Sequence, residues 1–254
     1  MTLEEIQARI RTAPELDFGN IFQESIDLFK KSIVHGFVLQ IITALLVAPF
    51  IIILYVPFVL SAMAVDNNNV YSMEPDGELM VFSTGIIILL VIVVLITGIV
   101  AFLLQAGFMR ILKMLDDGLT VSTKELFYFF KSEYIGKAAL LLLATIIISS
   151  IAIILFVLPI FYVIVPLIYF QYVFAFNPTL SKGQIVTASF NLGNKKWLIS
   201  FGLYMVSSIL ASIVGFLLCG IGMLFTAPFI YHPLYFIYKK VVGFETYSNE
   251  VRAV

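Results

Sequence analysis

The chain has 254 residues, of which 61% are hydrophobic and 12% are charged, and its mean hydropathy is +1.06. A soluble protein carries about 25% charged residues, and a disordered one is poor in apolar side chains, so this composition excludes both classes. The 15 Lys and Arg residues and 16 Asp and Glu residues give a net charge of -1. Without a surplus of basic residues, nucleic acid is not an expected partner.

Four long segments, 32–65, 79–109, 138–181 and 197–238, contain no charged residue. One helical crossing of a membrane needs about 20 residues, so the first two segments fit one span each. The last two fit two spans each, with turns at Leu158-Pro159 and at residues 219–222, which contain two glycines. The sequence therefore predicts an all-α polytopic membrane bundle, a single domain over residues 1–254, with transmembrane helices at 36–61, 81–106, 138–157, 160–177, 197–218 and 222–239.

All 15 Lys and Arg residues lie on one side of this six-span topology: before the first span, in two of the connections and after the last span. The loop between the first two spans carries only acidic charges, Asp66, Glu74, Asp76 and Glu78. Basic residues near span ends stay on the cytoplasmic side. Both termini are therefore predicted to be cytoplasmic.

An amphipathic pattern precedes the first span. Residues 22–33 place four apolar side chains on one helical face, Phe22, Ile26, Phe29 and Ile33, so residues 1–34 are predicted to form cytoplasmic and interfacial helices. A shift of 164 residues puts Val186, Phe190, Gly193 and Trp197 on those positions, and a shift of 101 puts Phe127, Phe130 and Tyr134 on the last three. This pattern predicts a unit of one amphipathic helix and a two-span hairpin, used three times.

Local signals mark two helix ends and two aromatic clusters. Thr2 and Glu5 are spaced as a capping box, and Gly118 is placed to stop an extension of the second span. Aromatic side chains gather at the ends of the fourth and sixth spans, as in interfacial belts or packing contacts, namely Tyr169, Phe170, Tyr172, Phe174, Phe176, Tyr231, Tyr235, Phe236 and Tyr238. In an alternative interpretation, Tyr162, Tyr169 and Tyr172 form a ligand-facing stripe with Gln171.

No Asp, Glu, Lys or Arg lies inside a predicted span. A retained intramembrane charge usually marks an ion or proton path, so the sequence argues against a proton-coupled pump and against direct pairing with a charged substrate. The candidates for polar contacts within the membrane are uncharged or weakly basic: Gln40, Gln105, Gln171 and His232. Ser207, Ala211 and Gly215 form a stripe of small residues that predicts close helix packing, within the chain or between copies.

The sequence predicts no catalytic, cofactor-binding or metal-binding residue, and we do not expect an enzyme. The two histidines, His35 and His232, are too few for a metal site, and Cys219 is a single cysteine that cannot form an internal disulfide. The acidic loop 66–78 has oxygen ligands for calcium but not the EF-hand order, so a solvated loop is favoured over a calcium site. Nucleotide-binding and hydrolase motifs are absent from the sequence.

Four segments carry a resemblance to a known group of proteins: FQESIDLFKK, AGFMRILKMLDDG, TASFNLGNKKW and CGIGMLFTAPFIYHPLYFIYKK. They resemble uncharacterised bacterial six-span proteins and the membrane portion fused to some glycerophosphodiester phosphodiesterases. The resemblance covers most of the chain and implies the fold, a bacterial inner membrane and a lipid-related setting. Its motifs are structural, so it implies no catalytic residues.

Two functional hypotheses follow. The first is a non-enzymatic scaffold, accessory or lipid-interacting subunit, with membrane lipids, other membrane proteins or a second copy as partners. The second is a transporter or channel for a neutral or lipid-like solute, in which Pro49 and Pro166 would break corresponding helices of an inverted repeat. A polar cavity lined by Gln40, Gln105 or Gln171 beside such broken helices would favour transport, and a closed bundle would favour the first hypothesis.

Overall fold

The computed structural model describes residues 1–64, 77–155, 158–218 and 220–244, and these residues form helices without a strand. Five helices are long and apolar enough to cross a membrane: α2 (Phe18–Ala64), α3 (Gly77–Asp116), α4 (Ser132–Ile154), α5 (Leu158–Phe176) and α7 (Trp197–Leu217). The helices α2 and α3 contain the first two predicted spans completely. The helices α4, α5 and α7 cover the next three spans except for one to three residues at their ends. The predictions for the acidic loop before Gly77, for Cys219 and for Arg252 lie outside the described residues.

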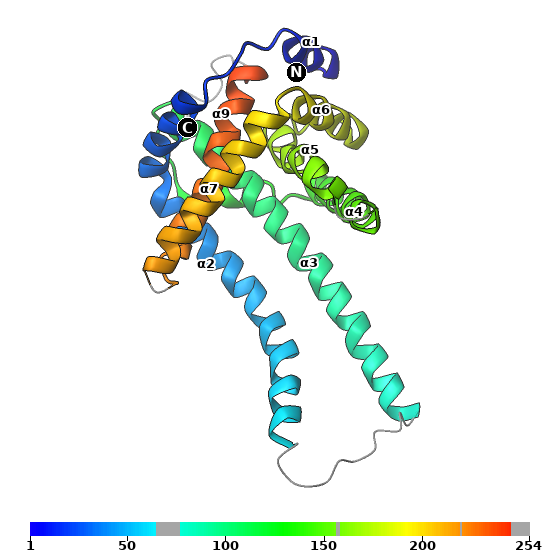
Figure 1. Ribbon diagram of the computed structural model, residues 1–254. Helices are drawn as coiled ribbons and strands as arrows, with labels where there is room; N and C mark the ends of the chain where they lie inside the picture. Colours follow the sequence, from blue (N-terminus) through cyan, green and yellow to red (C-terminus); the bar gives the residue numbers. More distant parts are fainter. Residues whose placement is uncertain (65–76, 156–157, 219, 245–254) are drawn as a thin grey trace.

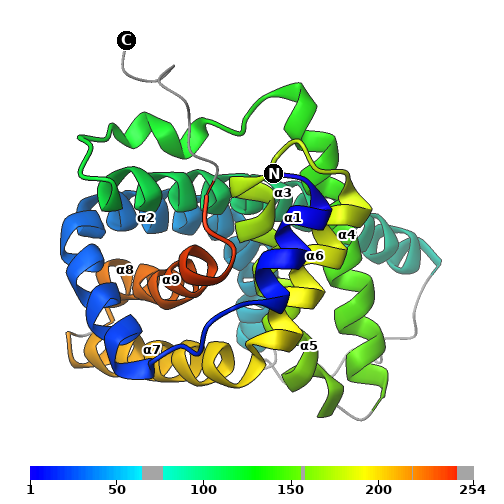
Figure 2. The same ribbon diagram turned by 90° about the horizontal axis from the view of Figure 1, so that it is seen from above.

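The sixth predicted span, 222–239, falls on three short helices in succession. These are α8 (Met223–Thr226), the 3-10 helix η2 (Ala227–Ile230) and α9 (Tyr231–Val241). Pro228 and Pro233 lie in this stretch, and proline removes a backbone donor and crowds the preceding turn. Figure 2 shows α9 near the centre, surrounded by α2, α3 and α7. Because none of the three pieces is long enough alone, the sixth crossing stays a prediction.

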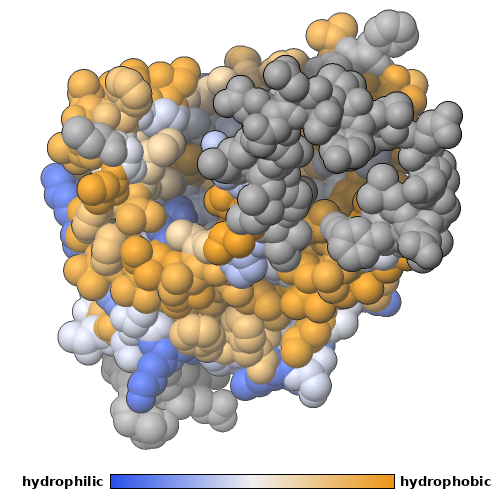
Figure 3. Space-filling view, turned by 90° about the horizontal axis from the view of Figure 1, so that it is seen from below, coloured by the Kyte–Doolittle hydropathy of each residue, from blue (hydrophilic) through white to orange (hydrophobic). Residues whose placement is uncertain are grey.

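The charged segments gather at one end of the molecule (Figure 1). The first helix, α1 (Leu3–Arg11), lies there with α6 (Lys182–Lys195) and the end of α9, while α2 and α3 extend away from it as a long hairpin. Ion pairs join distant segments at this end: Lys239 with Asp116 at 2.6 Å, Lys240 with Glu24 at 2.9 Å and Arg110 with Glu125 at 2.8 Å. Viewed from the opposite side, the described surface is mainly hydrophobic (Figure 3).

Both predicted helix-end signals are confirmed. Thr2 and Glu5 form a reciprocal capping box at the start of α1. Gly118 adopts a left-handed conformation with φ 76° after α3. Its N–H donates to the carbonyl of Leu115, and the N–H of Leu119 donates to that of Met114. This pair of bonds is the Schellman motif, which satisfies the last carbonyls of the helix.

The three predicted amphipathic segments differ in structure. The first is not a separate helix but the start of α2, which runs through without interruption. The second is α6, a separate helix that ends before α7 at Lys196. The third is replaced by the 3-10 helix η1 (Thr123–Phe127) and a turn, and Phe127 is 49% exposed. Only the second therefore has the expected form of a distinct helix before a span.

Neither proline of the transport hypothesis breaks a helix. Pro49 lies inside α2 and Pro166 inside α5, and both helices are continuous. Pro166 instead marks a close contact with α6, because a Cβ added to Gly193 would lie 2.8 Å from the Pro166 Cα. A side chain at position 193 would push these two helices apart. The expectation of broken helices at these positions is wrong.

Most of the aromatic residues at the ends of the predicted fourth and sixth spans are core residues, while Phe176 and Tyr231 are partly buried. Tyr169, Tyr172, Tyr235 and Tyr238 are fully buried. Their hydroxyls bond within the protein: Tyr172 donates to the Tyr231 carbonyl at 2.8 Å, and Tyr235 to Asp116 at 2.6 Å. An interfacial belt would expose such rings to headgroups, so that interpretation is wrong for these four, and packing between helices explains their density.

The small-residue stripe of α7 packs within the chain. Ser207, Ala211 and Gly215 are buried. The hydroxyl of Thr226 donates to the Ala211 carbonyl at 2.8 Å, and a Cβ on Gly215 would collide with Met223. Small side chains thus let α8 and η2 lie directly on α7.

Candidate binding cavity

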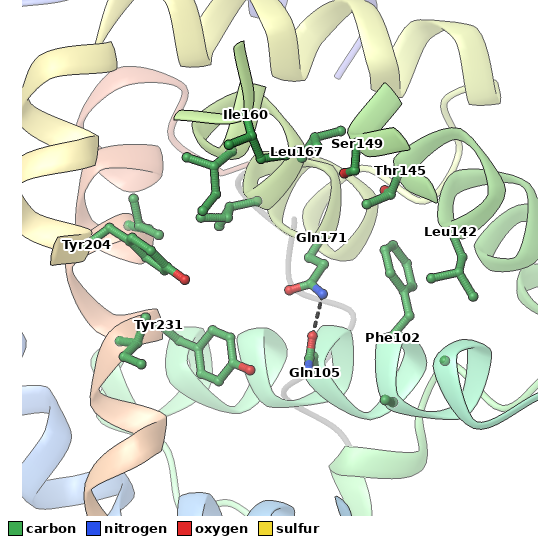
Figure 4. A pocket seen from close by; sticks show the side chains of 16 residues that line it. Phe102, Gln105, Leu142, Thr145, Ser149, Ile160, Leu167, Gln171, Tyr204 and Tyr231 are labelled. Carbon is green, nitrogen blue, oxygen red and sulfur yellow. Dashed lines mark hydrogen bonds between the residues drawn. The ribbon is translucent and has the colours of Figure 1, made fainter. Parts of the chain in front are cut away.

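A cavity of about 540 Å³ lies among α3, α4, α5, α7 and the η2–α9 segment (Figure 4). It is partly open rather than enclosed. Most of its lining is aliphatic or aromatic, as in Phe102, Leu142, Ile164 and Leu234. Small-molecule sites commonly combine such a size with apolar walls and a few polar groups, so the polar residues of the lining decide what it can bind.

Two glutamines from different helices meet in this cavity. Gln171 of α5 donates a hydrogen bond through Nε2 to Oε1 of Gln105 of α3. Each amide has one oxygen and one NH₂ group. The bonded pair therefore keeps a free carbonyl oxygen on Gln171 and a free NH₂ on Gln105, one acceptor and one donor within the same cavity lining. A hydroxyl group, which can donate and accept at once, matches this pair.

Two tyrosines add further polar atoms to the cavity. Tyr204 of α7 and Tyr231 of α9 point into the space beside the amide pair (Figure 4). Neither hydroxyl has a hydrogen-bond partner among the described residues. On the opposite wall, Thr145 of α4 satisfies its hydroxyl on the Leu141 carbonyl of its own helix at 2.9 Å. The Ser149 hydroxyl lies on the same wall as Thr145 and has no partner among the described residues. The two glutamines and two tyrosines nevertheless supply most of the polar atoms of the lining.

The described lining contains no Asp, Glu, Lys, Arg or His. A single charge at the centre of a membrane costs about 2.5–3.5 kcal/mol, and this cavity offers no opposite charge to offset it. An uncharged ligand is the chemistry that the walls favour: an apolar body with a hydroxyl or carbonyl at one end.

The other two predicted polar residues lie elsewhere. Gln40 is half-buried on α2, outside the cavity lining. His232 is fully buried beside the rings of Phe29 and Phe108. Its Nδ1 lies 3.0 Å from the Pro228 carbonyl and must carry the proton, so Nε2 accepts from the Ser32 hydroxyl at 2.7 Å. His232 thus ties α9 to α2 and is a packing residue.

The histidines do not form a metal centre. His35 contacts the Val121 carbonyl at 3.1 Å, and not His232. Among the described residues, no three His, Cys, Asp or Glu side chains converge as metal ligands.

The predicted ligand-facing stripe is only partly correct. Gln171 lines the cavity, but Tyr169 and Tyr172 are buried away from it, and Tyr162 donates to Asn194 of α6 at 2.7 Å. The sequence reasoning missed Tyr204 and assigned Tyr231 to an aromatic belt. A tyrosine in the middle of a charge-free helix was the signal available for Tyr204, because its hydroxyl needs a partner or a cavity.

Comparison of the chain with protein-family models, with curated proteins and with solved structures finds no significant match.

Proposed function

We propose that this protein is a non-enzymatic, lipid-interacting membrane protein that binds an uncharged amphiphile in the cavity between α3, α5 and α9. The observation that carries the proposal is the Gln105–Gln171 pair, which presents one donor and one acceptor at the base of apolar walls. A neutral lipid with a hydroxyl or ester head and one or more acyl chains has the matching chemistry.

The proposal includes the location. We place the protein in a bacterial cytoplasmic membrane as a six-span protein with both termini in the cytoplasm. The gathering of α1, α6 and the ion pairs at one end supports a single charged side. The helical path from Met223 to Val241 supplies the sixth crossing in this proposal.

We also propose that the first and last hairpins descend from one repeated unit. Under the shift of 164 residues, four buried positions carry the same residue: Ile21 and Ile185, Ser25 and Ser189, Leu28 and Leu192, Leu39 and Leu203. Both serines donate to the carbonyl four residues earlier, at 2.6 and 2.8 Å. The middle unit, which contains η1, lacks this correspondence.

A transporter for a neutral or lipid-like solute is the second candidate. The cavity lined by Gln105 and Gln171 favours it, whereas the continuous helices at Pro49 and Pro166 do not. Reconstituted vesicles separate the two, because a transporter moves the bound molecule across the bilayer and a binding protein only retains it.

Native mass spectrometry of the protein, extracted with a patch of its own membrane, tests the proposal. We expect a neutral lipid to remain bound to the wild-type chain. The variant carrying both Gln105→Leu and Gln171→Leu should lose it, because leucine keeps the volume but removes the polar pair.

The matched control is Gln40→Leu, which removes a glutamine outside the cavity. It should retain the lipid as the wild type does. Retention of nothing by the wild type, or equal retention by all three proteins, would overturn the proposed function.

A further inference from the structure

A second, chemically different hollow lies at the charged end of the molecule. It measures about 550 Å³ between α1 and α6 and is lined by Gln7, Ile10, Arg11, Asn191, Asn194 and Lys195. We infer that this α1–α6 groove binds the phosphate of an anionic phospholipid headgroup. The inference is independent of the neutral ligand proposed for the cavity.

The two cations of the groove lack protein partners, unlike most others at this end. Carboxylates or backbone carbonyls within the protein accept from Arg9, Lys30, Arg110, Lys113, Lys137, Lys196, Lys239 and Lys240. Arg11 and Lys195 have no such partner within the described part of the chain. The described lining also has no carboxylate, so the groove carries two positive charges without an internal counter-ion.

The side-chain amide of Asn194 supplies a further hydrogen-bond donor to the groove. The Tyr162 hydroxyl donates to Oδ1 of Asn194 at 2.7 Å, so the Asn194 amide keeps its NH₂ free. The Tyr162 carbonyl in turn accepts from the indole N–H of Trp197 at 3.0 Å. Guanidinium, ammonium and amide N–H groups are the donors that bind phosphate oxygens.

Lys196, the next residue after Lys195, already has a hydrogen-bond partner within the protein. Lys196 donates to the Pro14 carbonyl. Burial and then the nearby Lys195 lower the pKa of Lys196, while the charge of Glu15 acts in the opposite direction. Glu15 does not line the groove.

A lipid fits this groove better than a free phosphate ion because the groove borders an exposed apolar surface. Leu198, three positions after Lys195, is 78% exposed. Ile209, Ile213 and Phe216 are also exposed and extend this apolar surface along α7. A phosphate held by Arg11 and Lys195 would leave its acyl chains beside these side chains. Trp197 lies at the boundary between the two, a position that tryptophan favours in membrane proteins.

Trp197 is the single tryptophan of the chain and reports on the lipid beside it. The full chain is placed in phosphatidylcholine vesicles that contain a small fraction of brominated lipid, either phosphatidylglycerol or phosphatidylcholine. Bromine on the acyl chains quenches nearby tryptophan fluorescence. We expect phosphatidylglycerol to be enriched beside Trp197 about tenfold or more, given the attraction of two cations to an anionic lipid.

The double variant Arg11→Gln, Lys195→Gln should lose the enrichment of phosphatidylglycerol beside Trp197. The double variant Lys124→Gln, Lys182→Gln should keep it. The second variant removes the same charge at exposed lysines outside the groove. The conservative variant Arg11→Lys with Lys195→Arg should also keep it, which separates loss of charge from loss of structure. Equal quenching by the two lipids in the wild type, or equal loss in the matched variants, would contradict the inference.

Inorganic phosphate distinguishes the lipid from the free ion. If the groove holds a lipid, millimolar phosphate leaves the preference for phosphatidylglycerol in place. If phosphate abolishes that preference at constant ionic strength, the groove is a site for the free ion and the assignment to a lipid is wrong.

Discussion

The cavity and the α1–α6 groove have nearly the same volume, about 540 and 550 Å³, but opposite chemistry. The cavity pairs two amides between apolar helices, and its described lining carries no charge. The groove presents two cations without internal counter-ions. In the proposed topology the cavity lies between spans and the groove lies at the membrane surface, and a charge is costly inside a bilayer and cheap at its surface. Polarity is therefore built from amides and hydroxyls in the first region and from full charges in the second.

Exchanging the two chemistries should change the stability of the protein more than any other substitution considered below. Gln171→Lys places an unpaired charge in the cavity and should destabilise the protein by about 2.5–3.5 kcal/mol. Arg11→Gln removes an exposed charge and should change stability by less than about 0.5 kcal/mol. Thermal unfolding in one detergent measures both. Similar losses for the two variants would show that the cavity is as well hydrated as the groove.

The amide pair itself can be tested by a double-mutant cycle. Gln105→Leu alone leaves a half-buried amide without its partner and should cost about 1–3 kcal/mol, as should Gln171→Leu alone. The double variant should cost less than the sum, because both polar groups are then removed. Thermal or denaturant unfolding of the four proteins gives the coupling. Additive costs would mean that the two side chains do not depend on each other.

Salt should separate the two regions. Between 0.1 and 1 M salt, the Debye length falls from about 10 Å to about 3 Å. The tenfold enrichment of phosphatidylglycerol at the groove should then shrink toward none, whereas retention of the neutral ligand should not change. Trp197 quenching measures the first and native mass spectrometry the second. Parallel loss of both at high salt would show that one electrostatic effect controls the two regions.

Loosening the α1 wall of the groove should weaken lipid binding only slightly. Thr2→Ala removes the cap of α1 and should weaken that helix by about 1 kcal/mol. Hydrogen exchange within residues 3–11 should accelerate, and the enrichment beside Trp197 should fall in part. Ser181→Ala removes the cap of α6 and serves as the matched change on the other wall. An α1 helix that exchanges at an unchanged rate would mean that its packing on α6 alone holds it in place.

The hydropathy of the sequence predicted six spans, and five of them fall on helices long and apolar enough to cross a membrane. The predicted ends are close for α4, α5 and α7, whereas α2 begins 18 residues earlier and α3 ends ten residues later than predicted, because the helices continue through charged segments that hydropathy assigns to the outside of the membrane. The sixth was harder, since Pro228 and Pro233 divide its helical path into pieces. The first amphipathic segment was also mispredicted as separate. Nothing between Ile33 and the span stops the helix, and Gly36 there lies against Pro228 instead of forming a break.

The sequence could predict which residue types form the candidate site, but not which of those residues meet in space. The sequence marked Gln40, Gln105, Gln171 and His232 alike as polar residues in apolar helices. Only packing decides that Gln105 and Gln171 meet while His232 bonds to Ser32. The groove was out of reach for the same reason, because Arg11 and Lys195 are 184 positions apart and come together only when α1 lies on α6.

The unequal lengths of the helices have a consequence for the surrounding lipid. α3 has 40 residues and extends for about 60 Å, whereas α5, with 19 residues, extends for about 28 Å. In the proposed topology only the charge-free part of α3, residues 79–109, lies in hydrocarbon, and at about 1.5 Å per residue it is still longer than α5. The longer helix would then tilt or thicken the lipid around it, while the shorter one favours a thin bilayer. A change in the acyl-chain length of the surrounding lipid should therefore alter the tilt of α3 more than that of α5.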